Sequence, residues 1–195
     1  SAAGFEQSVR FYRQALQHQA DYAPALAGLS QTYALALYYN ALPPGTPDTL
    51  PRELAQQAIQ IDPALAEAHA ALGMVLGMVE FRWSEAETAA RRAIELDPRA
   101  ALAHGLYAAA VLKPQRRFPE ALASFRRALE LEPQLSFLNF TYAFALLASG
   151  DATAAIEQYR RTLSLQNIHP DMEWDYGMAL GFAGRHAEAA EAFAR

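Results

Sequence analysis

The chain has 195 residues, of which 52% are hydrophobic and 19% charged, so it can bury a sizeable core and does not resemble a disordered chain. The net charge of −5 disfavours binding to a nucleic-acid backbone, and the lack of cysteine excludes disulfides and thiolate zinc sites. The sequence has no recognisable signal peptide, and no apolar run reaches the roughly 18 residues that suggest a membrane span. We expect a cytoplasmic location and leave an extracytoplasmic one open.

Apolar residues recur at helical spacing along nearly the whole chain, which predicts an all-α fold. The predicted helices cover residues 5–19, 25–38, 52–61, 65–79, 84–96, 101–112, 119–131, 136–148 and 152–165. A further pair is expected after His169-Pro170, with its turn at Gly184. Ser84 and Glu87 have the spacing of a capping box, which predicts Ser84 as an N-cap. The one irregular stretch is residues 40–51, where four prolines and a glycine cannot continue a helix.

The chain contains an internal repeat, clearest in residues 66–98 and 101–133, which are two copies of one helix–turn–helix unit. Pro63, Pro98 and Pro133 close successive units at equal intervals of 35 residues (98 − 63 and 133 − 98). Small residues also recur seven apart, which places both members of a pair on one helix face. These pairs are Ala86 and Ala93, Ala121 and Ala128, and Ala155 and Thr162. We expect close helix–helix approach at these positions.

These residues resemble the tetratricopeptide repeat (TPR), whose pattern is W-x2-L-G-x2-Y, then A-x3-F, then P, over about 34 residues. The clearest copies are His69-x2-Leu72-Gly73 with Ala86, Ala93 and Pro98, and His104-x2-Tyr107-Ala108 with Ala121, Phe125, Ala128 and Pro133. The resemblance covers essentially the whole chain in five units. It departs from the pattern in lacking the first Trp, in the insertion at 40–51, and in Asn167 where a Pro is usual.

The resemblance implies a right-handed α-solenoid of antiparallel helix pairs, formed by one TPR domain over residues 1–195. The expected units are 1–22 (second helix only), 23–65 (with the Pro-rich insertion 40–51), 66–100, 101–135, 136–169 and 170–195 (incomplete). Both ends look cut, so we expect a fragment of a longer protein, whose exposed end repeats leave homodimerisation open. The stretches LAEAHAALG, FRWSEAE and RAIELDP are similar to TPR regions at the C-terminal end of bacterial signalling proteins.

The resemblance also places a ligand in a concave groove lined by the first helix of each pair. The groove residues expected to bind a partner are Met74, Met78, Phe137, Phe140, Phe144, Trp174, Asp175, Met178 and Phe182. Phe and Trp are typical interface anchors, so an apolar segment such as an amphipathic helix is the favoured occupant. The basic and amide side chains that clamp a peptide's terminal carboxylate in some TPR proteins are lacking. For any single aromatic residue, packing in the core is the competing interpretation.

Residue patterns for catalysis or cofactor binding are weak. His69 and His104 hold equivalent positions and could face each other, but a zinc ion needs more ligands and only Glu67 lies near, so helix packing is expected. Gly73 and Gly77 follow no strand and are interpreted as helix-packing glycines rather than a phosphate loop. Three of the Arg-Arg pairs, Arg91-Arg92, Arg116-Arg117 and Arg126-Arg127, are interleaved with Glu and are interpreted as solvated charges. We expect no cofactor or metal.

The favoured function is a non-catalytic protein–protein interaction scaffold, a module of a bacterial regulator that holds a peptide, an amphipathic helix or a neighbouring domain in the groove. The alternative is a sensor that binds a small apolar ligand in the same groove and relays the signal to an effector domain. An enzyme and a structural role in self-association are less favoured. Nucleic acid is not an expected partner.

Overall fold

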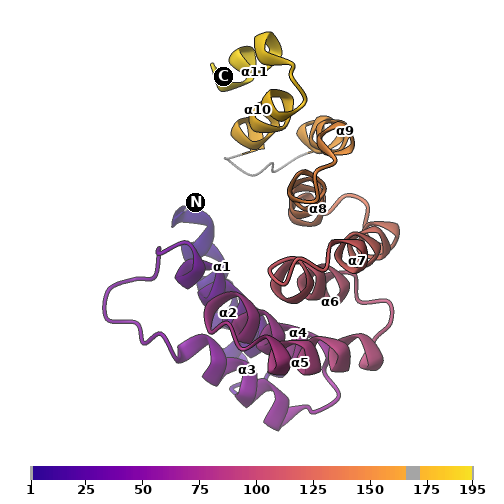
Figure 1. Cartoon of the computed structure of the whole chain (residues 1–195). Coiled ribbons are helices and arrows are strands. Elements are labelled where there is room, and N and C mark those ends of the chain that lie inside the picture. The colour runs from indigo at the N-terminus through magenta and orange to yellow at the C-terminus, as the bar shows by residue number, and fades with distance from the viewer. Residues whose placement is uncertain (1, 166–171, 195) are drawn as a thin grey trace. The chain divides into compact units, whose positions relative to one another are not determined.

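The structure is a computed structural model that describes residues 2–165 and 172–194. Within these ranges every regular element is a helix (Figure 1). The elements are α1 (Ala2–His18), α2 (Ala23–Tyr38), α3 (Leu50–Ile61), α4 (Ala66–Met74), η1 (Val75–Val79), α5 (Trp83–Leu96), α6 (Ala101–Leu106), η2 (Tyr107–Leu112), α7 (Phe118–Leu131), α8 (Ser136–Ala148), α9 (Ala152–Leu163), α10 (Met172–Phe182) and α11 (His186–Phe193). First helices (α2, α4 with η1, α6 with η2, α8 and α10) alternate along the sequence with second helices (α1, α3, α5, α7, α9 and α11).

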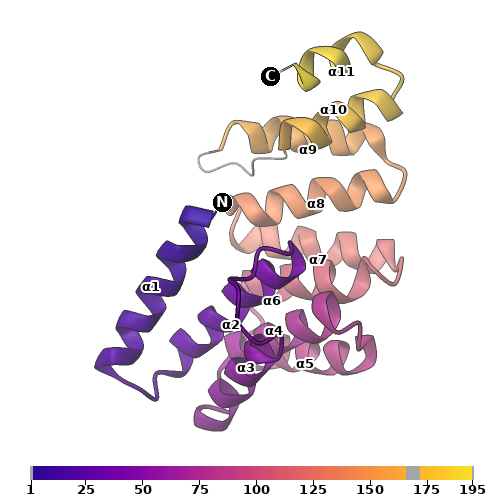
Figure 2. The same ribbon diagram turned by 90° about the vertical axis from the view of Figure 1, so that its left-hand side faces the viewer.

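The chain forms two compact units, residues 1–111 and residues 112–195. In the first unit α2 packs against α3, α4 packs against α5, and α2 also contacts α4. In the second unit α8 packs against α9 and α10 against α11, and α9 contacts α10 (Figure 2). The predicted helix at 136–148 has the predicted bounds, and the other predicted helices up to residue 165 are confirmed with shifts of a few residues at their ends. The predicted division into six repeat units stays a prediction.

Small buried residues let the helices approach one another. Ala58, Ala86, Ala93, Ala121, Ala128, Ala155 and Thr162 are fully buried. At Gly73, an added Cβ would lie 3.2 Å from the carbonyl oxygen of Ala86 and from the amide nitrogen of Ala90, so α4 and α5 meet backbone to backbone. The expected close approach at the seven-residue pairs therefore has its physical basis in side chains too small to hold the helices apart.

Two first helices differ from the predicted regular α-helices, because each changes to a π-helix in its second half. These segments are η1 and η2, which were expected to be the ends of helices 65–79 and 101–112. A π-helix is rare, because its wider turn packs less well than an α-helix. The two segments meet where Gly77 of η1 faces Ala110 of η2: a Cβ on Gly77 would lie only 2.3 Å from the Ala110 carbonyl oxygen. Their close contact is a tertiary feature that helical periodicity does not encode.

The predicted capping box is wrong. Helix α5 begins at Trp83, its N-cap is Arg82, and Ser84 lies inside the first turn, where its carbonyl accepts a hydrogen bond from Thr88. Phe81 in the preceding turn has a left-handed backbone (φ +56°), and the Arg82 amide reaches back 2.8 Å to the Leu76 carbonyl. This turn closes the preceding helix and starts α5 one residue early, so Ser84 is no longer at the cap.

Charged side chains of the second helices are largely neutralised within their own helix. Glu87 accepts from Arg91 at 2.8 Å, and the guanidinium groups of Arg117, Arg127, Arg161 and Arg185 pair with a glutamate three or four residues away. Such exposed pairs contribute little to stability, because solvent screens the two charges. Of the three Arg-Arg pairs interpreted as solvated charges, Arg117 is half-buried and the other five arginines are exposed. In the part of the chain that the structure describes, no helix has both the length and the apolar character needed to cross a bilayer.

Candidate functional site

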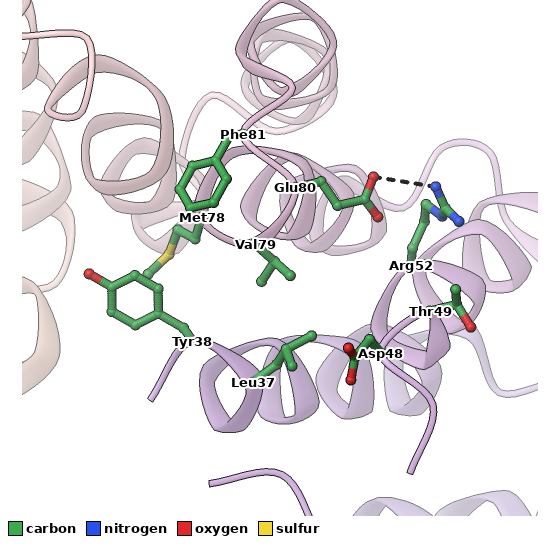
Figure 3. Close-up of a pocket in the computed structure, with 9 residues that line it drawn as sticks. All are labelled: Leu37, Tyr38, Asp48, Thr49, Arg52, Met78, Val79, Glu80 and Phe81. Atoms are coloured by element: carbon green, nitrogen blue, oxygen red, sulfur yellow. Dashed lines mark hydrogen bonds and ion pairs between the residues drawn. The ribbon is translucent and has the colours of Figure 1, made fainter. Parts of the chain in front are cut away.

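A recess of about 610 Å³ opens on the first unit, a volume within the usual range for ligand sites. It lies between the end of α2, the start of α3 and the turn that follows η1. Its lining residues are Leu37, Tyr38, Asp48, Thr49, Arg52, Met78, Val79, Glu80 and Phe81. Figure 3 shows Tyr38, Met78 and Phe81 at one end, and Asp48, Thr49 and Arg52 at the other. The recess therefore has an aromatic, apolar end and a polar end.

The Pro-rich insertion forms the polar end. It separates α2 from α3, and its last residues bring Asp48 and Thr49 to the recess. The start of α3 is tied to α2 because the buried Ser30 hydroxyl donates to the carbonyl of Pro51 at 2.7 Å. Pro51 lies in the first turn of α3, where a proline lacks only an amide that the helix would leave unbonded. The end of the insertion that lines the recess is thus fixed to α2.

An ionic network lies along one wall of the recess. Glu80 accepts from Arg52 at 3.3 Å and from Arg82 at 3.0 Å. Arg82 also forms two bonds to Glu85, and these contacts, with those to Glu80, raise its pKa above the usual arginine value. Among the described residues Asp48 has no hydrogen-bond or ion-pair partner. Asp48, Glu80 and Arg52 together leave the lining with one uncompensated negative charge.

Phe81 stands at the rim in an unfavourable backbone conformation. Its φ of +56° is left-handed, and its side chain is 63% exposed. Glycine occupies the corresponding turns before α9 and α11, at Gly150 (φ +96°) and Gly184 (φ +76°). A side chain in this region costs about 1–2 kcal/mol relative to a right-handed conformation. The Phe81 ring packs edge-on against Trp83 with 6.3 Å between ring centroids.

The predicted groove residues have three different environments. Met74 and Phe140 are buried, and the Phe140 ring packs 6.4 Å from that of Tyr159. Met78, Phe137, Asp175 and Met178 are half-buried, and Met78 lines the recess. Phe144, Trp174 and Phe182 are exposed by 37%, 60% and 73%. The structure therefore leaves three large aromatic side chains on the first helices α8 and α10 accessible to a partner.

The only lysine of the chain lies against one of these aromatic residues. The Lys113 ammonium is 4.9 Å from the centroid of the Phe144 ring, within the range of a cation–π contact. Burial lowers the pKa of Lys113 below its usual value. Lys113 forms no ion pair with any residue that the structure describes, unlike the arginines of the second helices. A positive charge that is partly desolvated and unpaired is therefore available next to Phe144.

Trp174 is packed on one side only. Its ring lies 4.8 Å from that of Phe193, and the Phe193 ring rests against the backbone of Gly177, where a Cβ would come within 2.6 Å of it. This contact fixes the orientation of the indole while most of its surface stays exposed. A rigid, exposed indole is a favourable anchor for a partner, because little side-chain entropy remains to be lost on binding.

The chain is similar to known proteins in its fold. No family model matches the sequence, and no curated protein matches it. Solved structures do match. TTC0263, described as a thermophilic TPR protein in Thermus thermophilus, is 19% identical, with 92% of each chain covered and a TM-score of 0.71. PilW, described as a widely conserved type IV pilus biogenesis factor, is 20% identical over 96% of this chain and 84% of its own, with a TM-score of 0.67.

A third structure, YrrB, described as a TPR protein with an unusual peptide-binding site, is 20% identical over 94% of this chain and 86% of its own, with a TM-score of 0.51. The chain has the TPR fold. The predicted all-α solenoid class is thereby confirmed, and so is the resemblance of the sequence to TPR proteins.

The residues that replace the first TPR tryptophan have a shared structural role. His69 is 2.9 Å from the Pro63 carbonyl, His104 is 3.0 Å from that of Pro98, and the Asn139 amide donates to that of Pro133 at 2.9 Å. Each ties a first helix to the turn that precedes it. Within residues 2–165 and 172–194 no three His, Cys, Asp or Glu side chains are placed to hold a metal ion.

Sequence reasoning missed most of the recess. It found Met78, but not Tyr38, Asp48, Arg52 or Phe81. One signal was present: Phe81 stands where the turns before α9 and α11 carry Gly150 and Gly184, while the turn before α7 carries Arg116. A large aromatic residue at a glycine position of a turn indicates a side chain that is needed at the surface. The predicted features around His169-Pro170 and Asn167 lie outside the described residues.

Proposed function

We propose that this chain is a non-catalytic interaction scaffold that holds a peptide, an amphipathic helix or a neighbouring domain against its first helices. The TPR fold supports a general role in protein–protein interaction. The single observation that carries the proposal is the set of exposed aromatic side chains on consecutive first helices of the second unit, Phe144, Trp174 and Phe182. We call these three residues with Lys113 the aromatic surface. The sequence likeness to bacterial signalling proteins supports a place in a regulator.

The energetics of the aromatic surface favour an apolar partner. A buried aromatic side chain contributes about 1.5–3 kcal/mol relative to an exposed one, so covering three of them offsets much of the entropy lost on association. Trp and Phe are both enriched at the cores of such interfaces, and Trp is among the residue types that dominate their binding energy. The half-buried Phe137 and Met178 extend the apolar area on the same helices. Met adapts to irregular shapes, which suits a helix laid along the surface.

Lys113 favours a partner that carries a negatively charged side chain. Its ammonium lies on the Phe144 ring and has no acidic partner among the described residues. A carboxylate from a partner would supply the missing counter-charge in a partly desolvated place, where an ion pair is stronger than in water. The segment proposed to bind is therefore mainly apolar and carries an acidic side chain. Neutral and basic segments of equal hydrophobicity would bind more weakly.

The test is a selection of phage-displayed random peptides on the immobilised protein, followed by synthesis of the enriched peptides. Affinity is measured by tryptophan fluorescence in the Trp83→Phe variant, which leaves Trp174 as the only reporter. We expect at least a tenfold loss of affinity in Phe144→Ala and in Phe182→Ala, and a loss in Lys113→Met for peptides with an acidic residue.

The matched control is Phe11→Ala, which removes an aromatic side chain of similar exposure from α1, a second helix of the first unit. Circular dichroism confirms that each variant is folded. Peptides that bind Phe11→Ala normally and lose affinity for the aromatic-surface variants support the proposal. Peptides that bind all variants equally place the site elsewhere and contradict it.

A further inference from the structure

We propose that the recess of the first unit is a second binding site, which takes a partner segment presenting an aromatic or long aliphatic side chain next to an arginine or lysine. The site is separate from the aromatic surface and is built from α2, the Pro-rich insertion, α3 and the turn after η1. It depends on the proposed scaffold function only in that its ligand is a protein segment.

The apolar end of the recess fits a single large side chain. Tyr38 and Phe81 stand on either side of Met78, whose flexible thioether lies between the two rings (Figure 3). Tyr38 is 50% exposed and Phe81 63%, so both rings have surface that a partner can cover. Leu37 and Val79 form the floor between the two ends. Aromatic walls with a methionine between them accept rings and branched aliphatic groups alike.

The polar end selects for positive charge. Asp48 has no partner among the described residues, and the one cation near it, Arg52, is already bound to Glu80. A basic side chain placed beside Asp48 would pair with it, and its aliphatic stem would lie along the apolar part of the recess. The whole chain carries a net charge of −5, which also favours the approach of a basic segment.

The local backbone supports a role beyond folding. Phe81 keeps a left-handed conformation that Gly150 and Gly184 adopt without strain in the turns before α9 and α11, and Arg116 (φ +59°) shares it before α7. The preceding turn is a π-helix, a rare form that is frequent at functional sites, and it contributes Met78 and Val79 to the lining. Residues 39–49 form a longer connection than the ones that join α8 to α9 or α10 to α11. The long insertion, the π-helical segment and the left-handed turn at Phe81 all contribute lining residues to one recess.

The experiment uses a peptide array in which each spot carries one Phe or Leu beside Arg, Ser or Glu, in otherwise neutral surroundings. The full chain is applied in solution. We expect Arg spots to bind at least tenfold more protein than Glu spots, with Ser spots between them, and the preference to shrink as salt is added. The best peptide is then titrated against the Trp174→Phe variant, in which Trp83, packed on Phe81, is the only fluorescent reporter.

Two variants test the polar and the apolar end of the recess separately. Asp48→Asn should remove the preference for Arg over Ser while Phe and Leu still bind. Phe81→Gly should weaken all spots about tenfold, and this variant is expected to fold because glycine suits the left-handed turn. Phe11→Ala is the control for loss of an exposed aromatic side chain. Circular dichroism and urea unfolding verify each variant.

The outcomes distinguish this site from the aromatic surface. Array binding that is lost in Phe81→Gly and kept in Phe144→Ala supports the proposal. Binding that is lost in Phe144→Ala and kept in Phe81→Gly overturns it while leaving the scaffold function in place. Equal binding to Arg and Glu spots also overturns it. If no peptide shifts Trp83 fluorescence but phenethylammonium does, the occupant is a small cation and the proposal of a protein segment is wrong.

Discussion

Replacement of Gly77 by alanine is expected to destabilise the first unit because of the contact between η1 and η2. An added Cβ would lie 2.3 Å from the Ala110 carbonyl oxygen and 3.0 Å from its carbonyl carbon, whereas ordinary contact begins at 3.4 Å. The two backbones would have to separate by about 1 Å. A carbonyl inside a helix cannot rotate away, since it is fixed by the helix that contains it. The whole η1–η2 contact must therefore shift.

The magnitude follows from two opposed effects. Overpacking a close contact costs about 1–3 kcal/mol, and a backbone obstacle places Gly77→Ala at the upper end. Alanine regains about 1 kcal/mol over glycine in a helix, which leaves a net loss of about 2 kcal/mol. With a urea dependence of about 2 kcal/mol per molar, the unfolding midpoint should fall by about 1 M. The shape of the recess should also change, because Met78, which lines it, directly follows Gly77 in η1.

Two other glycines provide matched controls in α10. Gly177 would place a Cβ 2.6 Å from the Phe193 ring, which is a 45% exposed side chain rather than a backbone group, so Gly177→Ala should cost less than Gly77→Ala. At Gly181 the added Cβ meets nothing within 4 Å, so Gly181→Ala should be stabilising by up to about 1 kcal/mol.

The assay is urea unfolding followed by tryptophan fluorescence in each unit separately. Trp83 alone reports on the first unit in the Trp174→Phe background, and Trp174 alone reports on the second in Trp83→Phe. We expect Gly181→Ala to gain stability, Gly177→Ala to lose some, and Gly77→Ala to lose the most. A Gly77→Ala variant that is as stable as wild type, or one that gains stability as Gly181→Ala does, would refute the reasoning from the backbone contact.

Three further predictions concern polar groups and are read out by urea unfolding. The Tyr159 hydroxyl is buried with no hydrogen-bond partner among the described residues, so Tyr159→Phe should be neutral or stabilising by about 1 kcal/mol. Tyr107→Phe loses a 2.8 Å hydrogen bond to Glu87 and should cost about 1 kcal/mol. Equal losses of stability in the two variants would contradict this prediction. Burial lowers the pKa of Lys113, so the folded protein releases this proton at a lower pH than the unfolded chain does. The stability of the wild type relative to Lys113→Met should therefore rise as the pH increases towards 10.5, the ordinary pKa of lysine. A stability difference that is constant with pH would count against this prediction. Gln158 donates to the buried Asn139 side-chain oxygen at 2.7 Å, so Gln158→Ala should cost about 1–3 kcal/mol by leaving that oxygen unpaired, and a smaller loss would mean that water replaces the bond.

The helices were predictable because their signal is local. Periodic apolar residues, prolines at 35-residue intervals and alanines seven apart all act within one helix or one turn. Helical periodicity does not predict the π segments, where Gly77 meets a residue 33 positions away (110 − 77). The capping box failed for a related reason. Its spacing was correct, but the left-handed turn at Phe81 moved the start of α5.

The sequence predicts which residues belong to the groove, and does not predict which of their side chains are exposed. Phe140 and Phe144 lie four residues apart on one stripe of α8, and the sequence assigns both to the groove. The structure buries Phe140 against Tyr159 and leaves Phe144 exposed beside Lys113. The difference arises from neighbouring helices, which periodicity within α8 does not describe. The recess was missed because the insertion has no periodicity that could show which of its residues face inward.

The distribution of paired and unpaired charges indicates how a partner is selected. Arginines of the second helices bind glutamates of the same helix, so they offer a partner little net charge to recognise. Asp48 in the first unit and Lys113 in the second have no such partner among the described residues, and they have opposite signs. Lys113 lies on the exposed Phe144 ring, and Asp48 lies at the polar end of a recess whose other end is aromatic, so a counter-charge at either place is partly desolvated on binding. The two sites should therefore accept segments of opposite charge, and a peptide chosen by one should be a poor ligand for the other.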